Sequence, residues 1–370
     1  MATASEQDDL FDEERNAVTD DAEQDESVAI ERYDITSFGA DYDVEGLVKR
    51  LNRGDIFIPP FQRDYVWTQK EASRFVESLL LGLPVPGVFM AREADTNKLL
   101  VIDGQQRLKS LQFFYNGIFN PRPEEKSQRI FELSKVQPKF ESRTYQTLEA
   151  QDRIKLNDSI IHATVVKQEA PQGDDTSIYY IFERLNYGGR RLTPQEIRVA
   201  IYNGPLIEAI TQLNDYQPWR DIYGKKSPRL KDHELILRFL AFFADAPSYE
   251  RPMTEFINKF AGKHRRAKAE KLGEWKTLFR TTIDVFAKAL GRRAFRPENA
   301  VNAAVFDSMM VGMAHRLAKG PIEDATAVLE AYQSLLVNSA YSQASGRSTA
   351  DEKFVSLRLK LATEAYSKLP

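Results

Sequence analysis

The pattern of apolar and polar residues changes near the middle of the chain. In the first half, short apolar runs that favour strands alternate with stretches in which apolar residues recur every three or four positions, as in helices. Beyond Pro205 the pattern is helical throughout, with glycine and proline between the helices. The sequence therefore predicts an α+β fold, a small mixed-sheet domain over 32–205 followed by an all-helical domain over 206–370.

Individual elements follow from the same pattern. Strands are expected near 33–38, 88–91, 98–102 and 159–167, with the second and third paired as a hairpin. Asp43, Thr68 with Glu71, and Thr193 with Glu196 have the spacing of helix N-caps. Helices of the second half are expected near 206–213, 232–245, 252–261, 268–290, 298–317, 322–338 and 350–368.

One junction between a strand and a helix concentrates polar groups. An apolar run over 99–102 ends at Asp103, Gly104, Gln105, Gln106 and Arg107, and a helix follows directly. Free backbone N–H groups and the positive end of the helix dipole meet at such a junction, which suits a phosphate or another anion. We therefore predict an anion site here, to which Arg107 would add a fork of donors.

Charge and composition set the chain's first 31 residues apart. Twelve acidic residues against Arg15 give this segment a net charge of −11, and the remaining residues carry +8. A segment so acidic and so poor in large apolar residues is expected to be disordered. It is either a solubilising tail or a cover for a basic nucleotide or nucleic-acid site. The absence of cysteine removes disulfides, thiol nucleophiles and cysteine-based zinc sites.

Several other classes of site and location are excluded. Gly262-Lys263 is followed by His264 and lacks the first glycine of a phosphate-binding loop. His233-Glu234 resembles the start of a zinc-protease helix, but Leu237 occupies the second histidine position, and no metal site is expected. No apolar run approaches the ~20 residues needed to span a bilayer, and the N-terminus, Met1 to Glu6, lacks the basic region and the apolar core expected of a signal peptide. We expect a cytoplasmic protein without a membrane partner.

Three blocks of sequence resemble one known family. They are Ile58-Pro59-Pro60-Phe61-Gln62-Arg63-Asp64-Tyr65-Val66-Trp67, then Val101-Ile102-Asp103-Gly104-Gln105-Gln106-Arg107, then Phe182-Glu183-Arg184-Leu185-Asn186-Tyr187-Gly188-Gly189. In order and spacing they resemble the N-terminal domain of GmrSD-type restriction endonucleases, of the ParB/sulfiredoxin-like superfamily. The resemblance covers about residues 35–205. The histidine-centred HNH-type nuclease motif of longer members has no counterpart in residues 206–370.

The resemblance implies a nucleoside triphosphate as ligand, often hydrolysed, and Mg²⁺ as its companion. Asp103 and Arg107 would act in catalysis, and Arg107 would contact phosphate. The nucleotide-binding residues would be Gln62, Arg63, Asp103, Gly104, Gln105, Gln106, Arg107, Arg184, Asn186, Gly188 and Gly189. For Tyr65 and Trp67, packing in the core and stacking on a base are equally open.

A basic stretch in the second half is a candidate for contacts with DNA phosphates. Lys263, Arg265, Arg266, Arg292 and Arg293 carry this prediction, and a solvated helix face is the alternative.

Three functions follow from these observations. The leading one is a nucleotide-binding sensor or regulator of a DNA-targeting restriction or anti-phage system, whose partners are DNA and a separate nuclease subunit. A second is a DNA-binding adaptor without catalysis. A third is a metal-dependent DNA nickase that would rest on Asp103 alone.

Overall fold

The structure is a computed structural model that describes residues 18–19, 34–58, 65–93, 96–122, 127–170, 176–185, 192–346 and 348–370. The described residues divide into two compact units. An α/β unit contains those of 34–192 with 199–201, and a helical unit contains 18–19, 193–198 and those of 202–370. The α+β prediction is confirmed, because the mixed sheet lies in the first half and helices dominate the second.

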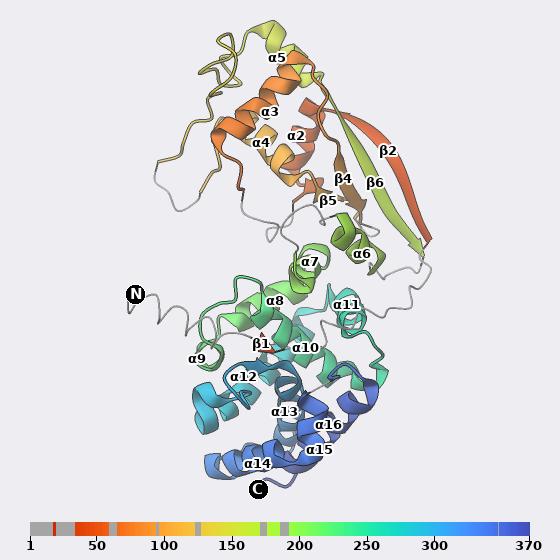
Figure 1. Cartoon of the computed structure of the whole chain (residues 1–370), viewed down its shortest axis with the longest axis vertical. Coiled ribbons are helices and arrows are strands. Elements are labelled where there is room, and N and C mark those ends of the chain that lie inside the picture. The colour runs from red at the N-terminus through yellow and green to blue at the C-terminus, as the bar shows by residue number, and fades with distance from the viewer. Residues whose placement is uncertain are drawn as a thin grey trace. The chain divides into compact units, whose positions relative to one another are not determined.

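The α/β unit follows the predicted order of strands and helices (Figure 1). Its elements are β2 (Asp34–Asp43), α2 (Val44–Arg53), β3 (Ile56–Phe57), α3 (Gln69–Leu81), β4 (Val88–Arg92), β5 (Leu99–Asp103), α4 (Gln105–Asn116), α5 (Ala150–Asn157), β6 (Ile160–Ala170), α6 (Thr176–Leu185) and the end of α7 (Pro194–Ile201).

Five strands form one mixed sheet in the order β2-β6-β4-β5-β3. The predicted hairpin is confirmed, because β4 and β5 are antiparallel and Phe89 pairs with Asp103. The pairs β3 with β5 and β4 with β6 are parallel. Because parallel strands end at the same edge of a sheet, the chain leaves β3 on the side where β5 ends at Asp103.

The sheet is covered on both faces. Val101 of β5 and Val165 of β6 belong to a core shared with α2, α3 and α4, which Figure 1 shows together on one side of the strands. Alternate residues of β5, among them Leu100 and Ile102, are also buried and point to the opposite face. The helix α6 contacts both β5 and β6. Burial on both faces is the reason why 99–102 is continuously apolar.

Local signals in the sequence located several helix ends correctly. The Asp43 carboxylate accepts a hydrogen bond from Gly46 N at 2.6 Å and caps α2. Thr68 forms a capping box at the start of α3, and Thr193 forms another before Pro194 of α7. The first predicted strand was too short, because β2 continues to Asp43 along its antiparallel partner β6.

The helical unit is built around one buried helix. Its elements are β1 (Val18–Thr19), the start of α7, α8 (Pro205–Asn214), α9 (Gln217–Tyr223), α10 (Lys231–Asp245), η3 (Ala246–Ser248), α11 (Met253–His264), α12 (Ala269–Leu290), η4 (Gly291–Arg293), β7 (Val301–Asn302), α13 (Ala303–Leu317), α14 (Ala325–Val337), α15 (Ser339–Gly346) and α16 (Glu352–Tyr366). Nearly all residues of α13 are buried, and it packs against α10, α12 and α16.

The structure corrects the sequence predictions in four further places. Helices α9 and α15 were not predicted, and α13 begins at Ala303 rather than near 298 because β7 precedes it. Val18 and Thr19, within the segment expected to be disordered, instead form β1, because they pair in parallel with Val301 and Asn302. The rest of 1–31 lies outside the described residues.

Candidate functional site

The strand-to-helix junction turns on Gly104. Its φ of 99° lies in the left-handed region, which side chains with a Cβ avoid. A Cβ at this position would lie 2.5 Å from Cγ1 of Val88 on the neighbouring strand. Gly104 is also the N-cap of α4, so no cap side chain accepts hydrogen bonds from the first N–H groups of the helix. No side chain of the cap residue therefore covers the first turn of α4.

Arg107 and Asp103 form an ion pair at this junction. Nη2 of Arg107 lies 2.8 Å from Oδ2 of Asp103. The Arg107 side chain is 15% exposed and the Asp103 side chain 52% exposed, so a nearly buried guanidinium is held by a carboxylate that reaches solvent. A guanidinium carries five N–H donors, so one bond to Asp103 leaves capacity for a second acceptor.

Gln106 joins the first and second sequence blocks. Its side-chain oxygen accepts hydrogen bonds from the backbone N–H groups of Val66 at 3.0 Å and Trp67 at 3.3 Å. Its backbone oxygen accepts a bond from the Ser110 hydroxyl at 2.7 Å, and Ser110 in turn bonds the Tyr65 hydroxyl at 2.7 Å. Gln106, predicted to contact nucleotide, therefore fixes residues 65–67 against the first turn of α4.

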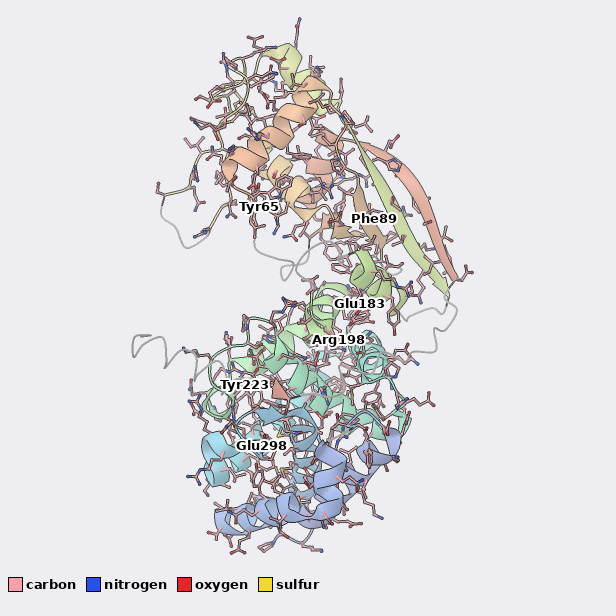
Figure 2. The ribbon with its side chains drawn as sticks, viewed as in Figure 1. Tyr65, Phe89, Glu183, Arg198, Tyr223 and Glu298 are labelled. Atoms are coloured by element: carbon pink, nitrogen blue, oxygen red, sulfur yellow. The ribbon has the colours of Figure 1, made fainter. Side chains whose placement is uncertain are left out.

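The structure favours packing over stacking for the two aromatic residues that follow Arg63. Tyr65, labelled in Figure 2, is 8% exposed, and its ring meets Phe113 and Phe119 edge-on. Burial raises the pKa of its hydroxyl to about 12. Trp67 is half-buried against Phe75 at a centroid distance of 5.8 Å. Both rings hold the 65–67 segment in the core of the α/β unit.

The other residues predicted to bind nucleotide lie in different parts of the α/β unit or outside the described residues. Gln105 is the first residue of α4 and is half-buried. Arg184 is exposed near the end of α6, and within the described ranges no hydrogen bond or ion pair joins it to the β5–α4 junction. Five others lie outside the described residues: Gln62, Arg63, Asn186, Gly188 and Gly189.

The predicted DNA contacts separate into two groups at the ends of α12. Lys263 pairs with Asp245 at 3.0 Å, and Nε of Arg265 donates to the Asn203 carbonyl at 2.8 Å, so both have partners inside the helical unit. Arg266, like Arg292 and Arg293 on η4, is exposed. Because α12 has 22 residues at 1.5 Å each, about 33 Å separates the two groups.

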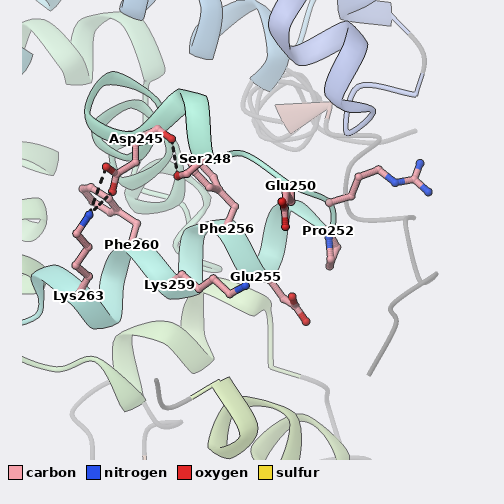
Figure 3. A pocket seen from close by; sticks show the side chains of 10 residues that line it. Asp245, Ser248, Glu250, Pro252, Glu255, Phe256, Lys259, Phe260 and Lys263 are labelled. Atoms are coloured by element: carbon pink, nitrogen blue, oxygen red, sulfur yellow. Dashed lines mark hydrogen bonds and ion pairs between the residues drawn. The ribbon is translucent and has the colours of Figure 1, made fainter. Parts of the chain in front are cut away.

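A pocket of about 400 Å³ lies between the end of α10 and α11. Phe256 and Phe260 form its apolar wall, and Lys263 is paired with Asp245 at its rim (Figure 3). It contains no predicted nucleotide residue. Acidic and basic side chains are both present around it, so it offers no single charge for a ligand.

A buried polar cluster that holds α7 was missed from the sequence. Nη1 of Arg198 pairs with Oε2 of Glu234 at 2.8 Å, and its Nε donates to Oδ1 of Asn258 at 2.8 Å. Glu234 is thus an ion-pair partner rather than part of a zinc helix. The sequence did not indicate these contacts, because Glu234 and Asn258 lie 36 and 60 positions from Arg198.

Two negative findings apply to the part of the chain that the structure describes. No group of three or more histidine, aspartate or glutamate side chains could hold a metal ion there. None of the helices there is long and apolar enough to cross a membrane.

Comparison with known proteins finds a similarity over most of the α/β unit. Residues 44–203 match the family model of the GmrSD restriction endonuclease, N-terminal domain. This stretch of the chain is similar to the GmrSD N-terminal domain. This match relates the chain to restriction systems, and it contains both the β5–α4 junction and the 65–67 segment. Over 99 residues, the chain is also 31% identical to an uncharacterized protein of Methanocaldococcus jannaschii, a match that covers 20% of this chain and 16% of that protein.

Proposed function

We propose that the α/β unit of this chain binds a nucleoside triphosphate at the β5–α4 junction, as the nucleotide-responsive part of a DNA-targeting restriction or anti-phage system. The observation that carries the proposal is the Arg107–Asp103 pair beside a helix N-terminus whose cap, Gly104, has no side chain. A helix N-terminus and a guanidinium both favour phosphate oxygens.

The exposed Asp103 carboxylate would repel a triphosphate bound at this junction. A triphosphate that contacts Arg107 would come close to Asp103, and two like charges about 4 Å apart repel by about 4 kcal/mol at an effective dielectric of 20. Oxygen ligands from a carboxylate and from phosphates are the set that Mg²⁺ prefers. We therefore expect Asp103 to hold Mg²⁺ together with the nucleotide, where the ion would neutralise phosphate charge.

Hydrolysis is the second part of the proposal. Arg107 would stabilise the negative charge that develops on the transferred phosphoryl group. Asp103 keeps the Arg107 guanidinium oriented before nucleotide arrives, at the 2.8 Å separation described above. Gln62, Arg63 and the 186–189 segment remain proposed contacts that would complete the site.

Calorimetry with ATP, GTP and CTP, each with and without Mg²⁺, tests the proposal. Arg107→Ala should weaken binding of the preferred nucleotide at least tenfold, and phosphate release should fall with it. Arg53→Ala is the matched control, because Arg53 forms an exposed pair with Asp55 at the same 2.8 Å in the same unit. Equal nucleotide affinity in the wild type and in Arg107→Ala would refute the site.

A second candidate function is a DNA-binding adaptor that works with a separate nuclease subunit. The exposed side chains of Arg266, Arg292 and Arg293 favour it. Neutralising phosphate charge releases counterions, so such binding should weaken steeply with salt. Fluorescence anisotropy with a labelled duplex should show weaker binding by Arg292→Ala/Arg293→Ala, whether or not nucleotide is present. A duplex affinity that ignores both salt and these substitutions would exclude the adaptor.

A further inference from the structure

An aromatic side chain lies beside the β5–α4 junction. In the antiparallel pair of β4 and β5, Met90 lies opposite Val101, and the register then shifts by one residue, so that Phe89 lies opposite Asp103. Opposed residues of antiparallel strands have Cα atoms about 4.5–5.5 Å apart. Asp103 in turn holds the Arg107 guanidinium in the ion pair described above. Phe89 is therefore the residue of β4 that lies next to the proposed phosphate site.

A second contact joins the end of β4 to the same site. A Cβ built on Gly104 would lie 2.5 Å from Cγ1 of Val88 and 3.4 Å from Nη2 of Arg107. Both atoms thus lie against Gly104, one on β4 and the other on α4. Because Phe89 directly follows Val88, its backbone belongs to the same turn of the molecule as the guanidinium.

The Phe89 side chain points away from the core that β4 shares with α2, α3 and α4. Val88 and Met90 belong to that core, and side chains alternate between the two faces of a strand. Phe89, labelled in Figure 2, is half-buried. In the described ranges Tyr65 and Trp67 have aromatic partners, and Phe89 has none. Part of the Phe89 ring is therefore open to a ligand.

The proposed ligand has a part that Arg107 and the helix N-terminus do not recognise. Those groups favour phosphate oxygens, whereas a nucleobase stacks on aromatic rings. Tyr65 and Trp67 are packed in the core of the α/β unit, which leaves stacking to another aromatic residue. Phe89 has the required side chain at the required place, beside the phosphate site and outside that core.

We propose that Phe89 contacts the base of the nucleotide whose phosphates Arg107 binds. The contact makes the junction select a nucleoside triphosphate over inorganic triphosphate. Because every base has a face that can stack, Phe89 adds affinity without choosing between the bases. This inference rests on the nucleotide site proposed above, and it assigns the side of that site from which the base is bound.

Phe57 supplies a matched control on the same sheet. It is half-buried on β3 and pairs with Leu100, while Ile56 before it belongs to the core. Phe57 therefore lies on the same face of the sheet as Phe89, but its register position is three residues before Asp103. At about 3.3 Å per residue this places it about 10 Å farther along the strand direction.

Calorimetry on the full chain compares ATP, GTP, CTP and inorganic triphosphate, each with Mg²⁺. Phe89→Leu keeps an apolar side chain but removes the ring. We expect it to weaken binding of the preferred nucleotide at least fivefold and to leave the affinity for inorganic triphosphate within twofold of the wild type. Phe57→Leu should leave both affinities within twofold. Unchanged triphosphate binding also shows that the junction of Phe89→Leu is folded.

A second variant keeps an aromatic ring and reports on the contact directly. Phe89→Trp places an indole at the same position, and stacking of a base on it should quench its fluorescence. At equal saturation we expect the preferred nucleotide to quench Phe89→Trp at least twofold more than Phe57→Trp, and inorganic triphosphate to quench neither. Equal quenching of the two variants by nucleotide would overturn the contact.

The outcomes separate this inference from the function on which it rests. Equal nucleotide affinity in the wild type and in Phe89→Leu overturns the base contact and leaves the nucleotide site standing. If Phe89→Leu loses affinity for nucleotide and for inorganic triphosphate to the same extent, Phe89 shapes the junction and the base contact is overturned. A wild type that binds neither ligand refutes the nucleotide site itself, and the contact with it.

Discussion

The side-chain oxygen of Gln106 accepts a hydrogen bond from the backbone N–H of Val66 at 3.0 Å, and this contact joins the sequence block 58–67 to the block 101–107. Gln106→Ala should remove this bond and the one from Trp67. We expect a loss of about 1–2 kcal/mol in the free energy of unfolding, measured by urea denaturation, and weaker nucleotide binding.

Gln106→Glu is the control for that prediction, because it keeps an acceptor oxygen and places a negative charge at a helix N-terminus. Its stability should match the wild type. If both variants lose equal stability, Gln106 acts through its amide N–H groups instead.

Gly104→Ala should destabilise the domain through two separate effects. The left-handed backbone costs a Cβ-bearing residue about 1–2 kcal/mol. The clash with Val88 at 2.5 Å adds about 1–3 kcal/mol of overpacking.

Gly117→Ala isolates the first effect, since Gly117 has a φ of 77° but no atom within 4 Å of the added Cβ. Urea denaturation should show a larger loss for Gly104→Ala than for Gly117→Ala. Equal losses would mean that Val88 moves aside without cost.

Asp307→Asn should be among the most destabilising single substitutions in the helical unit. Asp307 is fully buried, lies 2.6 Å from Nη2 of Arg238, and lies 3.9 Å from Nη2 of Arg358. Removing its charge leaves two buried guanidinium groups together, which costs about 3–5 kcal/mol. Asp55→Asn removes an exposed pair and should cost less than about 1 kcal/mol in the same thermal or urea titration.

The buried Glu234 predicts how stability depends on acid. Burial alone would raise the pKa of this carboxyl, but Lys231, Arg198 and Arg238 outweigh burial and lower the pKa to about 2. A carboxyl whose folded pKa lies below its unfolded value stabilises the fold above the unfolded pKa, and it loses that contribution as pH falls toward the folded pKa.

We therefore expect Glu234→Gln to be less stable than the wild type at pH 7, and the difference to shrink between about pH 4.5 and pH 2. Urea denaturation across this range measures it. A difference that stays constant with pH would show that Glu234 contributes through packing rather than through its charge.

Local signals were sufficient to predict the junction at Gly104. A buried apolar run, a glycine and a helix period all lie within one short stretch, so the strand, turn and helix could be predicted together. The capping boxes at Thr68 and Thr193 could be predicted for the same reason, because the partner glutamate of each lies three residues further along the chain.

Contacts between distant residues were not predictable in this way. The role of Gln106 depends on where residues 65–67 lie after folding, and the pair Arg198–Glu234 joins residues 36 positions apart. The two residues of β1 carry no pattern of their own, because a strand this short is defined only by its partner β7. These features depend on pairing between residues far apart in the chain, and no local pattern in a single sequence indicates such pairing.

Asn302 also sets the order in which contacts can form during synthesis. Its side chain caps α13 by accepting the N–H of Val305 at 3.0 Å, while its backbone continues the strand that receives Thr19. Thr19 leaves the ribosome 283 residues before Asn302, so the β1–β7 pair can form only after residue 302 has been made.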